Sequence, residues 1–386
     1  MTETTTASDA VTPFTLAIPE ATLDDLRRRL EAVRWPDAET VPGWEQGVPL
    51  AKMQAVRDYW LDKYDWRRCE AMLNGMGQHR TRIDGLDIHF LHVRSPEPNA
   101  LPMILTHGWP GSVLEFAKVV GPLTDPVAHG GKAEDAFHVV IPSLPGYGFS
   151  ERPAQAGWTV ERIARAWVVL MARLGYDRYV AQGGDWGASV TNEIGAIAPP
   201  ELLAIHLNLP IGAPTEEDRA SLTEDDQKRL ADMQRHRAVG RGYSEQQSTR
   251  PQTLGYGLAD SAIGQAAWIW EKYREWSDCD GDPTNSFSMD ELLDNVMLYW
   301  LPNAAASSAR LYWHSLRNFA ANRVSVPVGI SVFPKEISRS PRKWVERRYS
   351  DLYYWNEQTR GGHFAAFEVP DLFVDEMRSC FARFRG

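Results

Sequence analysis

Gly183-Gly184-Asp185-Trp186-Gly187 is the stretch that decides the fold of this chain. It follows a short apolar run, residues 178–182, and precedes a segment of small residues that begins at Ala188 and predicts a helix. The order is strand, sharp turn, helix, in which glycines let the backbone turn tightly enough to raise one side chain above a sheet. That side chain is the carboxylate of Asp185. The alternative is a turn aspartate that caps the following helix, because Asp is favoured at N-caps.

A carboxylate at this turn has a chemical consequence. A serine that attacked a saturated carbon would form an ether, which water does not readily cleave. A carboxylate forms an ester instead, and a general base with water can hydrolyse an ester. The pentapeptide therefore predicts an enzyme that acts on alkyl substrates through a covalent ester.

Composition and charge exclude several classes of protein. The chain has 386 residues, of which 43% are hydrophobic and 24% charged, as in ordinary globular proteins. Its net charge of -10 argues against a nucleic-acid partner. The three cysteines, Cys69, Cys279 and Cys380, are too scattered for a zinc site or a disulfide framework. The start has no signal peptide, and no apolar run approaches the roughly 20 residues of a membrane span. We expect a soluble cytoplasmic protein without membrane contact.

The pattern of apolar residues changes along the chain. Helical spacing dominates at first, and an alternating segment around Asp84-Gly85 then predicts a hairpin at 80–94. Strands afterwards alternate with helices, which predicts an α/β fold with a mostly parallel sheet and helices on both faces. The early helices are expected at 21–33, 50–63 and 66–75. Strands are expected at 102–106, 137–142, 179–182, 202–209, 326–333 and 351–359, and further helices at 159–174 and 370–384.

Strand signals stop between residues 210 and 323. There we expect a polar helix at 216–239, a loop rich in glycine and serine at 240–249, and an aromatic-rich helix at 262–276. A helical insertion after a sheet strand is typical of a cap over an α/β active site. We therefore predict four segments: 1–79 as an N-terminal helical extension, 80–209 as the first part of the core, 210–323 as a helical cap (lid), and 324–386 as the second part of the core.

An ester intermediate needs a base to activate water and an acid to orient that base. In α/β-hydrolases they follow the nucleophile in the order acid, then histidine. Glu336 lies just past the strand that ends at Phe333, and His363 follows two glycines after the last strand. Each alone could be an ordinary loop residue. Finding them at strand ends in the required order predicts a catalytic triad of Asp185, Glu336 and His363.

The breakdown of the ester also needs donors for a tetrahedral oxyanion. His107-Gly108-Trp109-Pro110 follows an early strand, where the fold normally supplies one backbone N–H, and the residue after the nucleophile supplies the other. We expect the backbone amides of Trp109 and Trp186 to form this oxyanion hole. His107 precedes the turn, so we interpret it as structural.

Together these motifs resemble those of the microsomal-type epoxide hydrolases, and the resemblance extends over nearly the whole chain. The matching motifs are Trp35-Pro36, His107-Gly108-Trp109-Pro110-Gly111-Ser112, Gly146-Tyr147-Gly148-Phe149-Ser150, Gly183-Gly184-Asp185-Trp186-Gly187, Phe333-Pro334-Lys335-Glu336 and Gly361-Gly362-His363-Phe364-Ala365-Ala366. The resemblance implies an α/β-hydrolase fold with a helical cap and an N-terminal extension. It also implies Asp185 as nucleophile, His363 as base and Glu336 as the charge partner of the base.

The resemblance further implies two cap tyrosines that bind the epoxide oxygen and help it leave. Tyr243 and Tyr312 are the best matches, with Tyr256 and Tyr299 as alternatives. It implies hydrolysis of an epoxide to a vicinal diol without a cofactor or metal, and the aromatic-rich cap favours a bulky or aryl epoxide. We expect the membrane-anchoring segment of the animal members to be missing, so their membrane location is not expected for this chain. Soluble bacterial members that it resembles act in building enediyne-type antibiotics, so biosynthesis and detoxification are both expected roles. If the protein oligomerises, a homodimer is the expectation.

Two other functions stay open at this point. A haloalkane or haloacid dehalogenase uses the same aspartate turn, with indole N–H groups such as those of Trp109 and Trp186 binding the halide in place of a tyrosine pair. A non-catalytic binding protein could use the same scaffold. The intact nucleophile, acid and base argue against the latter.

Overall fold

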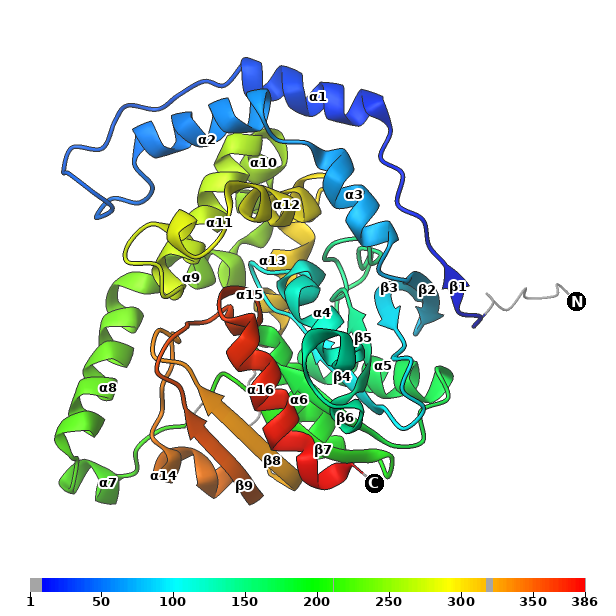
Figure 1. Ribbon diagram of the computed structural model, residues 1–386. Coiled ribbons are helices and arrows are strands. Elements are labelled where there is room, and N and C mark those ends of the chain that lie inside the picture. The colour runs from blue at the N-terminus through cyan, green and yellow to red at the C-terminus, as the bar shows by residue number, and fades with distance from the viewer. Residues whose placement is uncertain (1–8, 211, 317–321, 386) are drawn as a thin grey trace, which may run out of the picture.

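The computed structural model describes residues 9–210, 212–316 and 322–385 (Figure 1). Its centre is a nine-stranded sheet in the order β1-β2-β3-β5-β4-β6-β7-β8-β9. The strands are β1 (Thr12–Pro13), β2 (Gln78–Ile83), β3 (Leu86–Val93), β4 (Leu101–Thr106), β5 (Phe137–Pro142), β6 (Tyr179–Gly183), β7 (Leu202–Leu207), β8 (Val324–Val332) and β9 (Tyr349–Glu357). Residues 1–8 of the predicted extension, residues 211 and 317–321 of the predicted cap, and residue 386 lie outside the described part.

The sheet is mostly parallel, as expected. β5, β4, β6, β7, β8 and β9 pair in parallel, whereas β1, β2 and β3 join the edge beside β5 by antiparallel pairing. All residues of β4 and β6 are buried, which is typical of central parallel strands covered on both faces. This topology confirms the predicted α/β fold with a mostly parallel sheet.

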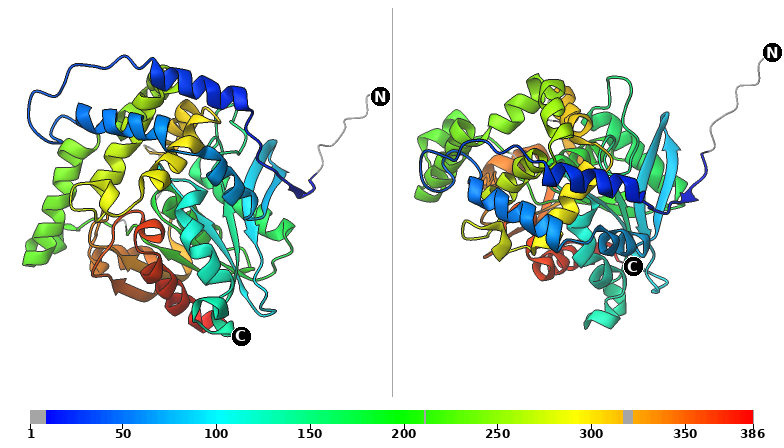
Figure 2. Two further views of the ribbon diagram at one scale, coloured as in Figure 1. Left: turned by 45° about the horizontal axis from the view of Figure 1, so that its top comes forward. Right: turned by 90° about the horizontal axis from the view of Figure 1, so that it is seen from above.

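Helices cover both faces of the sheet (Figures 1 and 2). α5 (Val160–Arg173) and α6 (Asp185–Ile197) pack together on one face, and α4 (Ala117–Thr124) and α16 (Pro370–Phe381) on the other. The apolar stripe of α5 is buried at Ile163, Trp167 and Leu170, spacings of three and four that place these side chains on one helix face. The short helices α14 (Arg342–Val345) and α15 (Ala365–Glu368) lie in the connections after β8 and β9.

The N-terminal segment contains α1 (Glu20–Glu31), α2 (Leu50–Asp62) and α3 (Trp66–Asn74). α1 and α2 lie across the cap helices, on the side away from the sheet (Figures 1 and 2). The Tyr64 hydroxyl donates a hydrogen bond of 2.8 Å to Asp294, and Arg68 bonds to the same carboxylate at 2.5 Å. The boundary expected at residue 79 was wrong in one respect, because β1 and the start of β2 already belong to the sheet.

Between β7 and β8 the chain is helical in its described part. The helices are α7 (Glu216–Ala220), α8 (Glu224–Arg235), α9 (Gly242–Thr249), α10 (Pro251–Asp260), α11 (Ala262–Trp276), α12 (Met289–Trp300) and α13 (Ala305–Ser315), with a π-helical turn at His236–Gly240. The single polar helix expected at 216–239 is broken. Two capping boxes, Thr215 with Asp218 and Thr223 with Asp226, start separate helices and explain the break.

The loop expected at 240–249 is the helix α9. Glycine and serine disfavour helices intrinsically, but Tyr243, Ser244, Gln247 and Ser248 are buried at helical spacing against the rest of the cap. Tertiary packing therefore overrides the local preference. The consequence for the site is that Tyr243 stands on a helix and not on a loop.

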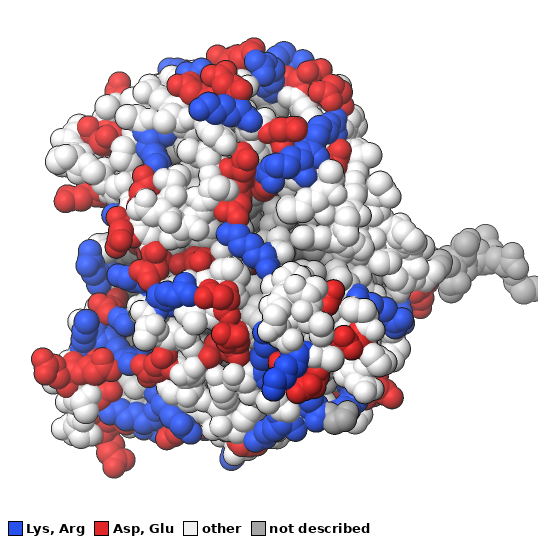
Figure 3. Space-filling model, viewed as in Figure 1, with Lys and Arg blue, Asp and Glu red and all other residues white. Residues whose placement is uncertain are grey.

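Charges on the surface are mixed. Figure 3 shows acidic and basic side chains interspersed over the face in view. Many of them pair, as Arg229 does with Asp225 at 2.6 Å and with Glu357 at 2.7 Å. None of the helices in the described ranges combines the length and apolarity that a membrane crossing needs.

Candidate active site

The turn at Asp185 lies at the carboxyl end of β6. Asp185 is the first residue of α6 and has a φ of 51°, a left-handed conformation that is costly for residues other than glycine. A Cβ atom at Gly187 would lie 1.8 Å from the carbonyl oxygen of Thr106. Only glycine therefore lets α6 begin this close to β4. The result is a carboxylate held above the end of the central strands.

The loop after β4 approaches the same carboxylate. The backbone N–H of Trp109 donates a hydrogen bond of 2.7 Å to Asp185 Oδ1. A Cβ atom at Gly108 would lie 2.1 Å from that oxygen, so glycine is needed here too. Trp186 follows Asp185, and its N–H belongs to the first turn of α6, where helix amides point toward the N-terminal end. The structure thus brings together the two residues expected to bind an oxyanion.

Helix α12 of the cap fixes this loop from above. Asn295 Nδ2 donates to the carbonyl of Pro110 at 2.7 Å, and the Tyr299 hydroxyl donates to the carbonyl of Gly111 at 2.7 Å. From below, His107 Nε2 accepts the N–H of Leu144 at 3.2 Å, and its Nδ1 lies 3.0 Å from the carbonyl of Gly108. His107 therefore holds the loop, in line with a structural role.

Glu336 and His363 stand where the sequence placed them, after β8 and β9. His363 Nδ1 lies 2.6 Å from Glu336 Oε1, and His363 Nε2 lies 3.4 Å from Asp185 Oδ2. The two loops are held side by side, because the N–H of Lys335 donates to the carbonyl of Gly361 at 3.1 Å. All three charged side chains are buried or nearly so.

The electrostatics of His363 follow from its two neighbours. Burial by itself lowers the pKa of His363, but the Glu336 carboxylate and the hydrogen bonds to Asp185 and Glu336 outweigh it and raise that pKa well above 6.5. His107, which lacks such a pair, shows the opposite effect, because burial lowers its pKa to about 4. Hence the imidazolium of His363 is stabilised as long as Asp185 is charged.

Two of the four candidate tyrosines line the same cavity as Asp185. They are Tyr243 from α9 and Tyr312 from α13, and both are buried. The Tyr243 ring stacks on Trp109 with centroids 5.0 Å apart, and Tyr312 meets Trp186 edge-on at 4.8 Å. Burial raises the pKa of both hydroxyls, so both stay protonated and able to donate.

The other two candidates are elsewhere. Tyr256 lies on α10 with 70% of its surface exposed to solvent. The hydroxyl of Tyr299 is committed to the carbonyl of Gly111, as described above. Neither lines the cavity at Asp185.

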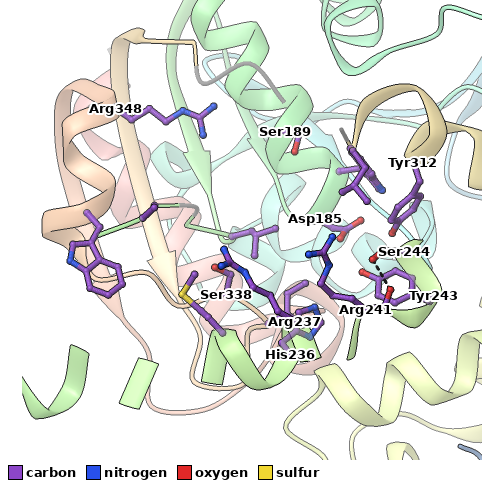
Figure 4. A pocket seen from close by; sticks show the side chains of 18 of the residues that line it. Asp185, Ser189, His236, Arg237, Arg241, Tyr243, Ser244, Tyr312, Ser338 and Arg348 are labelled. Atoms are coloured by element: carbon purple, nitrogen blue, oxygen red, sulfur yellow. Dashed lines mark hydrogen bonds between the residues drawn. The ribbon is translucent and has the colours of Figure 1, made fainter. Parts of the chain in front are cut away.

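The cavity has a volume of about 720 Å³ and lies between α8, α9 and α13 of the cap and the ends of β7 and β8. Figure 4 shows Tyr312 and Tyr243 on the same side of Asp185, with Arg241 and Arg237 on the segment that joins α8 to α9. Its wall near Asp185 is aromatic, and its outer part carries arginines. The cavity is thus large enough for a bulky substrate.

Within the part of the chain that the structure covers, no group of three or more His, Cys, Asp and Glu side chains has an arrangement that could hold a metal ion. The site combines a carboxylate at a sharp turn, a histidine paired with a second carboxylate, a backbone N–H that donates to the first carboxylate, and two buried hydroxyls. Such a set can form and hydrolyse an ester.

Some contributors to the site were not identified from the sequence. The carbonyl of Trp276 in α11 accepts the N–H of His363 at 2.9 Å, and the Trp276 ring packs edge-on against the imidazole at 5.1 Å. Asn295 has a similar supporting role on the Trp109 loop. The many tryptophans of the cap were the only sequence feature that pointed to Trp276, because a hydrogen bond to a backbone carbonyl does not depend on the residue type.

Comparison with known proteins shows the family to which this chain is similar. Residues 11–116 match the family model of the epoxide hydrolase N terminus, and residues 102–237 match that of the alpha/beta hydrolase fold. A Stigmatella aurantiaca protein named "Putative epoxide hydrolase" is 56% identical over 377 residues, which is 97% of this chain and 86% of that protein.

Epoxide hydrolase 1 of Sus scrofa is 34% identical over 96% of this chain and 88% of its own length. The crystal structure of juvenile hormone epoxide hydrolase from Bombyx mori superposes with a TM-score of 0.90 at 28% identity, covering 98% of this chain and 95% of that one.

Proposed function

Because this chain belongs to the epoxide hydrolase family and is therefore an enzyme that hydrolyses epoxides, we propose that it does so through a covalent ester on Asp185. One observation supports this mechanism above all. Asp185 lines the large cavity together with the two tyrosines, and His363 Nε2, whose Nδ1 pairs with Glu336, lies 3.4 Å from Asp185 Oδ2. The carboxylate is therefore open to a substrate in the cavity and close to a base that can activate water.

In the first step, Asp185 Oδ2 attacks an epoxide carbon. Oδ1 is held by the N–H of Trp109 at 2.7 Å, so Oδ2 is the oxygen left to react. The carbon–oxygen bond of the epoxide breaks as the Asp185 ester bond forms. An alkoxide in a buried site is costly, and Tyr243 or Tyr312 gives it a proton. Both hydroxyls are protonated because burial raises the pKa of each.

In the second step, water hydrolyses the ester. Once Asp185 is esterified its negative charge is gone, and one of the causes that raise the pKa of His363 disappears with it. His363 Nε2 can then accept a proton from water, while Glu336 stabilises the imidazolium through Nδ1. The oxyanion takes the place of Oδ1 and is stabilised by the amides of Trp109 and Trp186. Collapse returns the proton from His363 to the oxygen of the departing diol. The second proton of the water, left on the Asp185 carboxyl group, passes to the tyrosinate formed in the first step, which restores both the carboxylate and the hydroxyl.

The cap contributes specificity in this proposal. The cap helices α9 and α13 carry Tyr243 and Tyr312, which line one cavity with Asp185, and the aromatic wall favours a bulky or aryl epoxide. The volume of about 720 Å³ exceeds what a short alkyl substrate fills.

A paired assay tests the proposal. Styrene oxide is followed for diol and 1-bromobutane for released halide, with Asp185→Ala as the control. We expect diol without halide from the wild-type chain and no turnover from the variant. Halide without diol would favour the dehalogenase alternative, and diol formation by Asp185→Ala would contradict the ester mechanism.

A further inference from the structure

A second, much smaller cavity lies behind Asp185. Its volume is about 10 Å³, and Asp185 is the one lining residue that it shares with the large cavity. A cavity needs roughly 10–15 Å³ to hold a water molecule, so this space suits one water and nothing larger. The polar residues that line it are Glu115, Gln182, Asp185, Asn208 and His363.

The walls of this small cavity offer hydrogen bonds that the protein leaves unused. Gln182 is only 1% exposed, and its Nε2 donates to Asn208 Oδ1 at 2.8 Å. Its Oε1 is buried without a hydrogen-bonding partner among the described residues. A buried acceptor of this kind is costly unless it meets a donor, and a water in the cavity supplies one.

Glu115 reaches the cavity from the short helix η1 (Val113–Phe116), which follows the Trp109 loop. A Cβ atom at Gly111 would lie 1.1 Å from Glu115 Oε1, so glycine at 111 makes the room that this carboxyl fills. Burial raises the pKa of Glu115 to about 8, and the charges of Asp185 and Glu368 add to this, while His363 and a backbone hydrogen bond from Ser112 oppose it. At neutral pH the group is mostly a neutral acid, with one donor and one acceptor to offer.

We propose that the small cavity binds the hydrolytic water and that Glu115 is a positioning residue, which orients this water between His363 and the ester carbonyl of Asp185. The proposal rests on the ester mechanism given above. In this proposal two cavities serve Asp185. The epoxide binds in the large cavity, and the water is bound in the small cavity on the other side of the carboxylate.

The geometry defines what the water does. The water donates one hydrogen to His363 Nε2. Its other hydrogen points to the C=O oxygen of the Glu115 side-chain carboxyl group or to Gln182 Oε1. Its lone pair then faces the ester carbon of Asp185, where the new carbon–oxygen bond forms. The bond from that carbon to the alkyl oxygen breaks, and the alkoxide recovers the proton from His363. Glu115 neither gains nor loses a proton, so its effect is on the second step alone.

Single-turnover kinetics with excess enzyme separate the two steps. The rates of ester formation and ester hydrolysis are followed by acid quench and mass spectrometry of the peptide that contains Asp185. Glu115→Gln keeps a donor and an acceptor at similar volume, and Glu115→Met keeps the volume but removes them. Ser112→Ala is the matched control, because it removes the cap hydrogen bond from the Leu114 N–H at a residue that does not line the small cavity, and we expect it to slow neither step selectively.

We expect Glu115→Met to slow ester hydrolysis about 10- to 100-fold, with ester formation within about 3-fold of wild type, because misplacing a reactant by about 1 Å can cost 100-fold. Glu115→Gln should stay within about 5-fold in both steps. Unchanged hydrolysis in Glu115→Met, or equal slowing of ester formation and ester hydrolysis by that variant, would overturn the proposal. Glu115→Ala replaces the Met variant if that one does not fold. Absence of any ester in the wild-type chain and in His363→Gln would instead refute the ester mechanism, and the water site with it.

Discussion

The tyrosine pair allows a test in which activity and stability should move in opposite directions. The Tyr312 hydroxyl is buried and makes no hydrogen bond of good geometry to the described residues, with Tyr243 and Trp186 as its polar neighbours. A buried hydroxyl without a well-formed hydrogen bond costs about 1–3 kcal/mol. Tyr312→Phe should therefore leave the free energy of unfolding unchanged or raise it by up to that amount, since the ring packing against Trp186 is kept.

Tyr299→Phe is the matched control in the same cap. Its hydroxyl donates to the carbonyl of Gly111 at 2.7 Å, and the substitution leaves that buried carbonyl without its donor. We expect the free energy of unfolding to fall by about 1–3 kcal/mol. With 386 residues, 1 kcal/mol shifts the melting temperature by only about 1 °C, so urea unfolding is the better measurement.

The rate of ester formation should show the reverse order. Proton donation by a positioned group contributes about 10²- to 10⁴-fold. Since Tyr243 remains, Tyr312→Phe should slow ester formation by about 10- to 100-fold. The double variant that also carries Tyr243→Phe should slow it by about 10²- to 10⁴-fold. Tyr299→Phe should change this rate much less. If Tyr312→Phe destabilised the protein as much as Tyr299→Phe and left ester formation unchanged, Tyr312 would be a packing residue and the reasoning would fail.

Three further predictions concern the base and the turn. His363→Gln should form the ester and then stall, so the Asp185 peptide gains the mass of the substrate; rapid diol release would contradict the role of His363. Because the pKa of His363 is raised in the folded protein, its pairing stabilises the fold fully below its ordinary value of 6.5 and is lost as pH rises through the folded value. The difference in unfolding free energy between wild type and His363→Gln should therefore be largest below pH 6.5 and shrink as the pH rises above that value, and a difference that grows would show the opposite sign. Gly187→Ala should lower the free energy of unfolding by about 3 kcal/mol or more and abolish turnover, because its Cβ would lie 1.8 Å from a backbone oxygen. Gly257→Ala, in open space on α10, should raise the free energy of unfolding by about 0.5–1 kcal/mol. Equal urea midpoints for these two glycine variants would refute the steric argument.

Much of the site could be predicted because its residues follow strands. A carboxylate in a glycine-rich turn after one strand, an acid after another and a histidine after the last are local patterns, and parallel strands bring their carboxyl ends to one edge. Asp185, Glu336 and His363 were placed by this argument, and the structure brings them within hydrogen-bonding reach or close to it.

The cap could be predicted only in outline. Choosing among Tyr243, Tyr256, Tyr299 and Tyr312 depends on which helix face meets the core, and no local pattern gives that. α9 looked like a loop because glycine and serine are weak helix formers, and only its packing makes it a helix.

Glu115 shows a different limit of sequence reasoning. Ser112 and Glu115 have the spacing of a capping box, and that pattern alone explains both residues as a helix start. The structure adds that the carboxyl fills the space left by Gly111 and lines a cavity shared with Asp185 and His363. The capping-box pattern accounts for Ser112 and Glu115 in the sequence, but it does not reveal that Glu115 lines the site.

One labelling experiment tests the central claim, that the epoxide is opened by Asp185 and not by water directly. A single turnover is run in ¹⁸O-labelled water with enzyme in excess, and the peptide containing Asp185 and the diol are analysed by mass spectrometry. The account predicts that the label enters the Asp185 carboxylate in the first turnover and that the diol is unlabelled. Label in the diol with none in the Asp185 peptide would contradict it.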